Sequence, residues 1–277
     1  MNPRPTLSVI IIAQNEEQNL PGLLATLTWP DEIVLVDGGS TDATVDIARS
    51  HGARVHARPF DDFCRQQNHA LALARGDWVL SLDADERPTP ALVEEIRRRL
   101  PGCRENSFRT RIRSSIFGRR VRFSGTQDDR QVRLARRRRA HWAGEVHETL
   151  QAPGPVGQLQ HWLDHDPLPD LAAFLTKMHR YTVLAAGARL AAGMPPRRRD
   201  AWLAPMREIF RRLVWKQGIA DGPEGWAFCL LSGLSEWVLA DTHRRLWAEE
   251  GGRGDVSIAD YGLRITDWRR QSFVLGP

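Results

Sequence analysis

An apolar strand runs straight into two carboxylates in Trp78-Val79-Leu80-Ser81-Leu82-Asp83-Ala84-Asp85. Two carboxylates one residue apart, at the end of a buried strand, can hold one divalent cation, and oxygen ligands suit Mg²⁺ or Mn²⁺ better than zinc. A cation held by Asp83 and Asp85 can in turn grip a diphosphate. Because a D-x-D occurs by chance in many chains, its meaning depends on the sequence around it.

The first hundred residues alternate apolar runs with amphipathic segments. Strands are predicted at Leu7–Ala13, Ile33–Val36, Arg54–His56 and Asp77–Leu82. The segments between them have the length of helices, and Asp61 and Thr89 are in the right positions to cap two helices. Strands separated in this way indicate right-handed βαβ units and therefore an α/β fold with a mostly parallel sheet flanked by helices.

Polar residues follow three of these predicted strands. Asn15, Asp37 and the Asp83/Asp85 pair come at or just after the strand ends. In parallel α/β sheets, ligands bind outside the carboxyl ends of the strands. We therefore expect three separate loops to place polar groups along one edge of the sheet.

The pattern changes along the second half of the chain. From about Ser107 to Leu150 it predicts shorter strands with arginine-rich loops, Pro153–Pro169 is interpreted as a connector, and helices are predicted from Leu171 onward. We expect a catalytic domain over residues 1–152 and a C-terminal helical region over residues 153–277.

The net charge of the chain is +5, but the charged residues are distributed unevenly along it. Residues 1–96 carry 7 arginines and 15 acidic residues, whereas residues 97–139 carry 16 arginines and 3 acidic residues. Arginine makes bidentate contacts with phosphate, so the basic middle predicts an anionic partner such as a phosphorylated glycolipid, the membrane surface or nucleic acid. Solvation of the surface explains part of this charge. No nucleic-acid-binding motif is present, and no aromatic residues interleave with the arginines, so nucleic acid is not expected.

Two further features bear on the compartment. Cys64, Cys103 and Cys229 are scattered, which supports neither a disulfide framework nor a zinc site and favours the reducing cytoplasm. The apolar run that ends at Ile12 lacks the full pattern of a signal peptide and is interpreted as a strand.

The C-terminal region combines basic and aromatic residues on predicted helices. The segment Ala201–Gln217 is amphipathic, and the following helix carries Trp226 and Trp237 on one face. This combination fits an anchor lying in the membrane interface, so we expect peripheral contact with a membrane surface. The alternative is that these helices only pack on the catalytic domain, and both can hold.

The chain resembles the family 2 inverting glycosyltransferases of GT-A (Rossmann-like) fold, and within them the lipopolysaccharide-core β-1,4-glucosyltransferase subfamily. The resemblance is carried by five stretches: Ser8–Glu17 with its Asn15-Glu16-Glu17 turn, Asp31–Thr44 with Val36-Asp37-Gly38-Gly39-Ser40, Gly76–Glu86 with Asp83-Ala84-Asp85, Arg133-Leu134, and Gly144-Glu145-Val146-His147-Glu148.

This resemblance implies a metal-dependent enzyme of the cell envelope, cytoplasmic and peripheral to the cytoplasmic face of the inner membrane. The donor would be a UDP-sugar, glucose first, with GlcNAc, galactose or mannose as alternatives, and the cofactor Mg²⁺ or Mn²⁺. The acceptor would be an anionic glycolipid or oligosaccharide, either lipid-linked or part of the lipopolysaccharide core. Two other classes stay open: a nucleotide-sugar binding protein that has lost catalysis, and a nucleotidyltransferase. A nucleotidyltransferase should carry a glycine-rich basic loop after the first strand, which Ala13–Glu17 is not.

The resemblance also implies roles for individual residues. Asp85 would bind the metal, with Asp83 on the ribose or reaching the metal through water, and Asp129 would be the catalytic base, with Asp128 and Glu145 as the next candidates. Asp37 would contact the uridine or its ribose, although it could instead cap its own turn. The residues expected to bind the nucleotide sugar are Ala13, Asn15, Glu16, Asp37, Asn68, Asp83, Ala84, Arg133 and His147.

Overall fold

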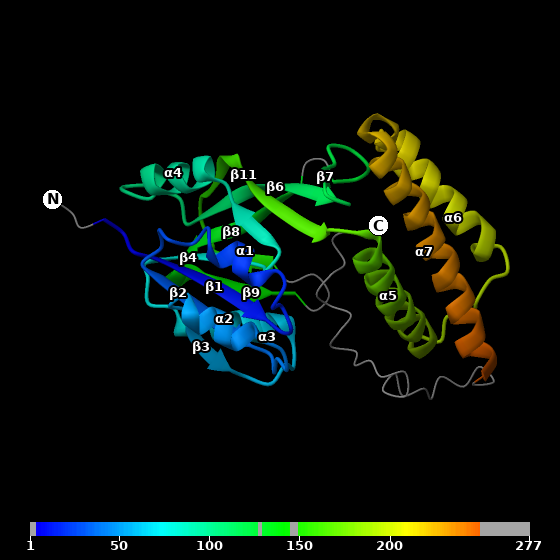
Figure 1. The fold of residues 1–277 in the computed structure, drawn as a ribbon, viewed down its shortest axis with the longest axis horizontal. Helices are drawn as coiled ribbons and strands as arrows, with labels where there is room; N and C mark the ends of the chain where they lie inside the picture. The colour runs from blue at the N-terminus through cyan, green and yellow to red at the C-terminus, as the bar shows by residue number, and fades with distance from the viewer. Residues whose placement is uncertain (1–3, 127–128, 145–148, 250–277) are drawn as a thin grey trace. The chain divides into compact units, whose positions relative to one another are not determined.

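The computed structural model describes residues 4–126, 129–144 and 149–249. The chain divides into two compact units. The first comprises Met1–Arg113 and Asp128–His165, and the second comprises Ser114–Gln127 and Asp166–Pro277. The first unit is built on a β-sheet and the second on helices (Figure 1).

Four parallel strands begin the sheet of the first unit. They are β1 (Leu7–Ala13), β2 (Glu32–Asp37), β3 (Arg54–Ala57) and β4 (Trp78–Leu82), in the spatial order β3-β2-β1-β4. All residues of β1 and β4 are buried, as expected of strands covered on both faces. The predicted fold class, an α/β sheet flanked by helices with a C-terminal helical extension, is confirmed.

Beyond β4 the sheet continues with antiparallel pairs, so it is mixed and parallel only in its first part, whereas a mostly parallel sheet was predicted. These strands are β8 (Arg130–Arg136), β6 (Ser107–Ile116), β11 (Val156–Leu168) and β5 (Glu86–Pro88), with β7 (Arg119–Arg120) paired to β6. A separate small sheet joins β9 (His141–Ala143) to β10 (Thr149–Gln151). The interpretation of Pro153–Pro169 as a connector is wrong, because this segment forms β11.

Helices cover the two faces of the sheet. They are α1 (Leu20–Leu24), α2 (Thr44–Ser50), α3 (Phe63–Leu73) and α4 (Pro90–Arg99). Val9 and Ile11 of β1 pack in one cluster with residues of α1, α2 and α4, whereas Ile10 and Ile12 pack in another with residues of α3. This alternation divides the core between the two faces.

The helix caps agree with the sequence at one position and differ at another. The Thr89 hydroxyl accepts from Leu92 N at 3.3 Å and caps α4, as predicted. At α3 the cap is Asp62, whose carboxylate accepts from Arg65 N at 3.1 Å. The predicted cap Asp61 instead pairs with Arg58.

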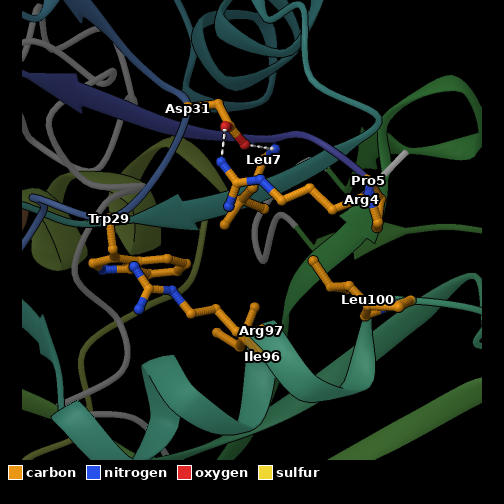
Figure 2. A pocket seen from close by; sticks show the side chains of 9 residues that line it. Arg4, Pro5, Leu7, Trp29, Asp31, Ile96, Arg97 and Leu100 are labelled. Atoms are coloured by element: carbon orange, nitrogen blue, oxygen red, sulfur yellow. Dashed lines mark hydrogen bonds and ion pairs between the residues drawn. The ribbon is translucent and has the colours of Figure 1, made fainter. Parts of the chain in front are cut away.

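Polar contacts fix the starts of the parallel strands. Gly76 N donates to Ser8 Oγ at 2.8 Å, and a Cβ atom at Gly76 would lie 2.7 Å from Ser8 N, so only glycine permits this approach of the segment before β4 to β1. Asp31 accepts from Arg4 at 2.6 Å and from Leu7 N at 2.9 Å beside a hollow of about 160 Å³ (Figure 2). This hollow lies where β1 begins, whereas the predicted site lies where the strands end.

The second unit is a set of helices that pack on one another. They are α5 (Leu171–Ala191), α6 (Asp200–Phe210) continued by a π-helical turn (Arg211–Trp215), a 3₁₀ turn (Gly218–Asp221) and α7 (Gly222–Glu249). Phe174 of α5 and Phe228 of α7 pack in one apolar cluster, and Leu190 and Leu239 in another. Among the described residues, no helix is long and apolar enough to cross a membrane.

The boundary between the two units does not fall at residue 152. Strand β11 follows that position and pairs with β5 of the sheet, so the first unit extends to His165. Residues 114–127 belong to the second unit, where the Asp221 carboxylate accepts from Arg122 N at 2.8 Å and from Ser124 Oγ at 2.7 Å. A division of roles between a catalytic domain and a helical region stays a prediction.

Candidate active site

The carboxyl end of β4 carries three acidic side chains within four residues. Asp83 and Asp85 are partly exposed, whereas Ala84 between them is buried and Glu86 is fully buried. Asp83 N donates to Glu86 Oε2 at 3.0 Å, and Glu86 N donates to Asp83 O at 3.0 Å. This reciprocal pair makes a tight turn from β4 into β5, which leaves the two aspartates at the edge of the sheet.

Arg133 of β8 ties this turn to the interior. One of its terminal nitrogens donates to Glu86 Oε1 at 2.5 Å and to Asp83 Oδ2 at 3.0 Å. Its Nε is buried without a hydrogen-bond partner among the described residues. Arg133 was predicted to bind the nucleotide sugar, and in the structure it makes hydrogen bonds with Glu86 and Asp83.

Burial and the opposite charge of the partner have opposing effects on the pKa values of Glu86 and Arg133. Burial raises the pKa of Glu86 to about 7, and the nearby Asp83 adds to the rise, although Arg133 and His165 oppose it. Burial by itself would lower the pKa of Arg133, but the charges of Glu86 and Asp83 outweigh it and raise that pKa. The guanidinium therefore stays charged, and it is the cation that offsets the acidic turn.

His165 is a site residue that sequence reasoning missed. The antiparallel pairing of β11 with β5 sets His165 opposite Glu86, and its Nε2 lies 3.5 Å from Asp85 Oδ2. Burial lowers the pKa of His165, but the charge of Asp85 and its hydrogen bond outweigh burial, so the net shift is upward. The segment Pro153–Pro169 was interpreted as a connector because proline and glycine residues are typical of loops, but it forms the strand β11 that carries His165.

The predicted base Asp129 lies at the same edge. Strand β8 runs antiparallel to β4 with Leu134 opposite Leu80, so the start of β8 lies beside the end of β4. Gln131 Nε2 donates to Asp129 Oδ1 at 3.3 Å. Burial raises the pKa of Asp129, while Gln131 and the charges of Arg133 and His165 lower it in part, so the net shift is upward. Arg133 and His165 are therefore neighbours of both Asp129 and the acidic turn.

The loops after β1 and β2 are joined by their own hydrogen bonds. Asp37 accepts from Gly39 N at 3.1 Å and from Ser40 Oγ at 2.5 Å, so it caps its own turn. Asn15 has a left-handed backbone (φ 55°), and its side-chain oxygen accepts from Thr41 N at 2.8 Å. The structure therefore brings the Asn15 and Asp37 loops together, as predicted from the strand ends.

Ala13 and Glu16, which were also predicted to bind the nucleotide sugar, make hydrogen bonds within the protein. Ala13 is buried, and its carbonyl accepts from Gly38 N at 2.8 Å. The Glu16 carboxylate accepts from Asn19 Nδ2 at 2.9 Å. Their contact with a nucleotide stays a prediction.

Asn68 of α3 makes side-chain hydrogen bonds with β9. Its Nδ2 donates to Trp142 O at 2.9 Å and its Oδ1 accepts from Trp142 N at 2.9 Å. The side chain thus uses both polar atoms to hold β9 against α3. Asp128, Glu145 and His147, which were also predicted as site residues, lie outside the described residues.

The acidic turn supplies atoms of the kind that bind Mg²⁺ or Mn²⁺. Asp83 and Asp85 offer carboxylate oxygens, and His165 offers an imidazole nitrogen next to Asp85. Within the ranges that the structure describes, no three His, Cys, Asp or Glu side chains converge in metal-binding geometry.

Glu86 was also missed by sequence reasoning, although it directly follows the D-x-D and its burial could have been inferred from the turn.

Comparison with known proteins relates most of the chain to sugar transferases. Residues 8–143 match the family model "Glycosyl transferase family 2". The lipopolysaccharide core biosynthesis glycosyltransferase LpsC of Rhizobium meliloti is 29% identical over 257 residues, which cover 88% of this chain and 95% of LpsC. An uncharacterized glycosyltransferase of Rickettsia typhi is 37% identical over 91 residues, and this match spans 32% of the chain and 31% of that protein.

A solved structure also matches part of the chain. Glucosyl-3-phosphoglycerate synthase of Mycobacterium tuberculosis, in complex with Mn²⁺, UDP and glucosyl-3-phosphoglycerate, is 27% identical with a TM-score of 0.36. The match covers 39% of this chain and 44% of that protein.

Proposed function

Because this chain is a family 2 glycosyltransferase, we propose that it transfers a hexose, glucose first, from a UDP-sugar to a saccharide acceptor with inversion at the anomeric carbon. One observation carries the proposal. The acidic turn after β4 and the carboxylate of Asp129 lie at the same edge of the sheet, where a donor diphosphate and an acceptor hydroxyl can be handled side by side.

A divalent cation fits the donor side of this site. We assign Asp85 as its ligand, with Asp83 binding the metal or the donor ribose, and His165 supplies a nitrogen beside Asp85. When bound, Mg²⁺ or Mn²⁺ would neutralise charge on the departing nucleoside diphosphate. Arg133 holds Asp83 in place through the hydrogen bond that it donates to Asp83 Oδ2.

Asp129 would act on the acceptor side. As the acceptor oxygen attacks the anomeric carbon, the bond from that carbon to the diphosphate oxygen breaks and UDP leaves with the electron pair. The Asp129 carboxylate takes the proton of the acceptor hydroxyl. The raised pKa of Asp129 supports this role, because a carboxylate that holds a proton more strongly is a better base.

The loops after β1 and β2 would hold the nucleotide. Asp37 and Asn15 are fixed by hydrogen bonds within these loops, which orders the edge that a uridine would meet. Preorganised polar groups of this kind reduce the entropy lost on binding.

The relatives and the charge of the chain support a proposal for the acceptor and the place of reaction. The name of LpsC refers to lipopolysaccharide core biosynthesis, and the arginine-rich residues 97–139 favour an anionic glycolipid or oligosaccharide. The three cysteines are free, which supports a reducing compartment. We propose that the enzyme works at the cytoplasmic face of the inner membrane.

A donor panel tests the proposal. UDP release and sugar transfer would be measured with UDP-glucose, UDP-GlcNAc and UDP-galactose in Mg²⁺ or Mn²⁺, using core oligosaccharide as acceptor. Preferential turnover of one UDP-hexose, lost in Asp129→Asn with UDP binding intact, supports the proposal. Binding of UDP-sugars without any turnover would instead support a binding protein.

A further inference from the structure

Helix α6 exposes its apolar side chains instead of burying them. None of its 11 residues is buried, and the side chains of Trp202, Met206 and Phe210 are 74%, 65% and 60% exposed. These three residues are spaced by four and therefore form one stripe along the helix. A stripe of large apolar side chains on the surface marks a contact with something other than water.

Helix α7 carries a second stripe of the same kind. Trp226, Leu230 and Leu234 are also spaced by four, and they are 46%, 54% and 41% exposed. The opposite side of α7 provides the buried residues of the unit, such as Phe228 and Leu239. The exposed stripe is therefore separate from the face that α7 uses for the core.

The two stripes lie on the same side of one helical hairpin. A Cβ atom at Gly233 would lie 2.4 Å from Ile209 Cγ1 and 3.1 Å from Pro205 O, so α6 packs directly on α7 at this glycine. The chain reverses through Gly218–Asp221, which makes the helices antiparallel neighbours (Figure 1). In an antiparallel pair, positions rotated in the same sense from the contact line fall on the same side.

The exposed residues of both stripes are rotated in the same sense from the contact between α6 and α7. Met206 and Phe210 each follow a contact residue of α6 by one position, and Leu234 follows Gly233 by one position, a rotation of about 100° in a helix. We call the resulting surface the hairpin face: Trp202, Met206 and Phe210 of α6 with Trp226, Leu230 and Leu234 of α7.

Exposed arginines lie next to the hairpin face in the chain. Residues 195–216 contain six arginines and one lysine against two acidic residues. Of these arginines, Arg212 is buried and pairs, like Arg211, with Glu208. Arg197, Arg198 and Arg199 directly precede α6, and Arg207 is exposed on the helix itself. An apolar face bordered by arginine and lysine is the pattern of helices that lie in the headgroup layer of an anionic membrane.

We propose that the hairpin face docks the protein on an anionic lipid surface, with its long helix axes in the plane of the membrane. Tryptophans stand near both ends of the hairpin, and tryptophan is the residue most favoured at the boundary between headgroups and acyl chains. The indole of Trp226 donates to Ile219 O at 2.8 Å, so it can leave water without losing a hydrogen bond. This inference stands on the second unit and is independent of the proposed transfer reaction.

Vesicle flotation of the full chain tests this inference. Vesicles of phosphatidylcholine alone would be compared with vesicles that also contain phosphatidylglycerol, at low and high salt. The test variant is Trp202→Ser with Phe210→Ser, and the control is Val156→Ser with Leu171→Ser, two exposed apolar residues (48% and 50%) outside the hairpin face. Thermal unfolding of each variant confirms that it is folded.

The expected result is flotation of the wild type with anionic vesicles, weakened by salt. We expect the test variant to lose roughly 10-fold or more in partitioning, and the control to match the wild type. Three results would overturn the inference: no flotation with anionic vesicles, equal flotation of the test variant, or a dimer in light scattering that the test variant abolishes. The last would assign the face to a second copy of the chain.

Discussion

Arg133 and Glu86 form an ion pair in the interior of the sheet, with 2.5 Å between Arg133 nitrogen and Glu86 Oε1. The side chain of Glu86 is fully buried and that of Arg133 is 8% exposed. Glu86 lies directly after the D-x-D, and Arg133 also binds Asp83. The pair therefore couples the stability of the fold to the position of the candidate metal ligands.

Removing the cation of this pair should be costly. At pH 8, above the pKa of about 7 that Glu86 has in the folded protein, Arg133→Met removes the cation beside the buried carboxylate. Glu86 must then stay charged without a partner or take up a proton, which is expected to lower the free energy of unfolding by about 3–5 kcal/mol. Chemical denaturation measures this loss. The control Arg138→Met, at an exposed position, should change stability by less than about 0.5 kcal/mol.

A second substitution separates the ion pair from general packing. In Arg133→Met with Glu86→Gln the buried charge is gone, and the amide oxygen can still accept from Asp83 N. We expect the double variant to recover a large part of the lost stability. If it is no more stable than Arg133→Met, the unpaired charge is not the cause.

Asp129 should control the pH dependence of turnover. Burial raises its pKa, and a base acts only when deprotonated, so kcat/KM should fall as the pH drops through a value above the ordinary aspartate pKa of about 3.9. Asp129→Asn should lower kcat by at least about 100-fold with UDP affinity unchanged. Loss of UDP affinity in step with kcat would instead assign Asp129 to donor binding.

Glu95 should hold β11, and with it His165, against α4. Its buried carboxylate accepts from Gln160 N and His161 N, each at 2.9 Å, and from the His161 ring. Burial alone would raise the pKa of Glu95, but these hydrogen bonds outweigh burial and lower it. Glu95→Gln should therefore cost about 2 kcal/mol at neutral pH.

The sign of the pH effect at Glu95 follows from its lowered pKa. The folded state holds the carboxylate ionised more firmly than the unfolded chain does, so the contribution is complete above the unfolded pKa of about 4.3. It disappears as the pH falls through the folded pKa. Denaturation of wild type and Glu95→Gln at several pH values should show the difference shrinking toward acid, and a constant difference would contradict this account.

The parallel part of the sheet is predictable from sequence because its signals are local. Buried parallel strands are continuous apolar runs, and three of the four here end in a polar loop, so the pattern alone assigns Asn15, Asp37 and Asp83 to one edge. Their distribution over one edge is confirmed by the pairing of β1 with β2 and β4. Periodicity also identifies the helices of the second unit.

The antiparallel part is harder to predict because its pairing is not local. His165 reaches Asp85 only through the pairing of β11 with β5, about eighty residues apart in the chain. Glu86 and Arg133 are both visible in the sequence, but their ion pair depends on the register of β8 against β4. Single-sequence patterns do not contain that register.

The central claim is that the carboxylates after β4 bind the metal that the transfer reaction needs. The most direct test measures UDP release from UDP-glucose with Mn²⁺ or with a chelator, in wild type, Asp85→Asn and the control Asp46→Asn, an exposed aspartate on α2. The account predicts Mn²⁺-dependent turnover in wild type and Asp46→Asn, and neither turnover nor Mn²⁺-dependent UDP binding in a folded Asp85→Asn. Turnover that persists in Asp85→Asn, or in wild type with chelator, would contradict it.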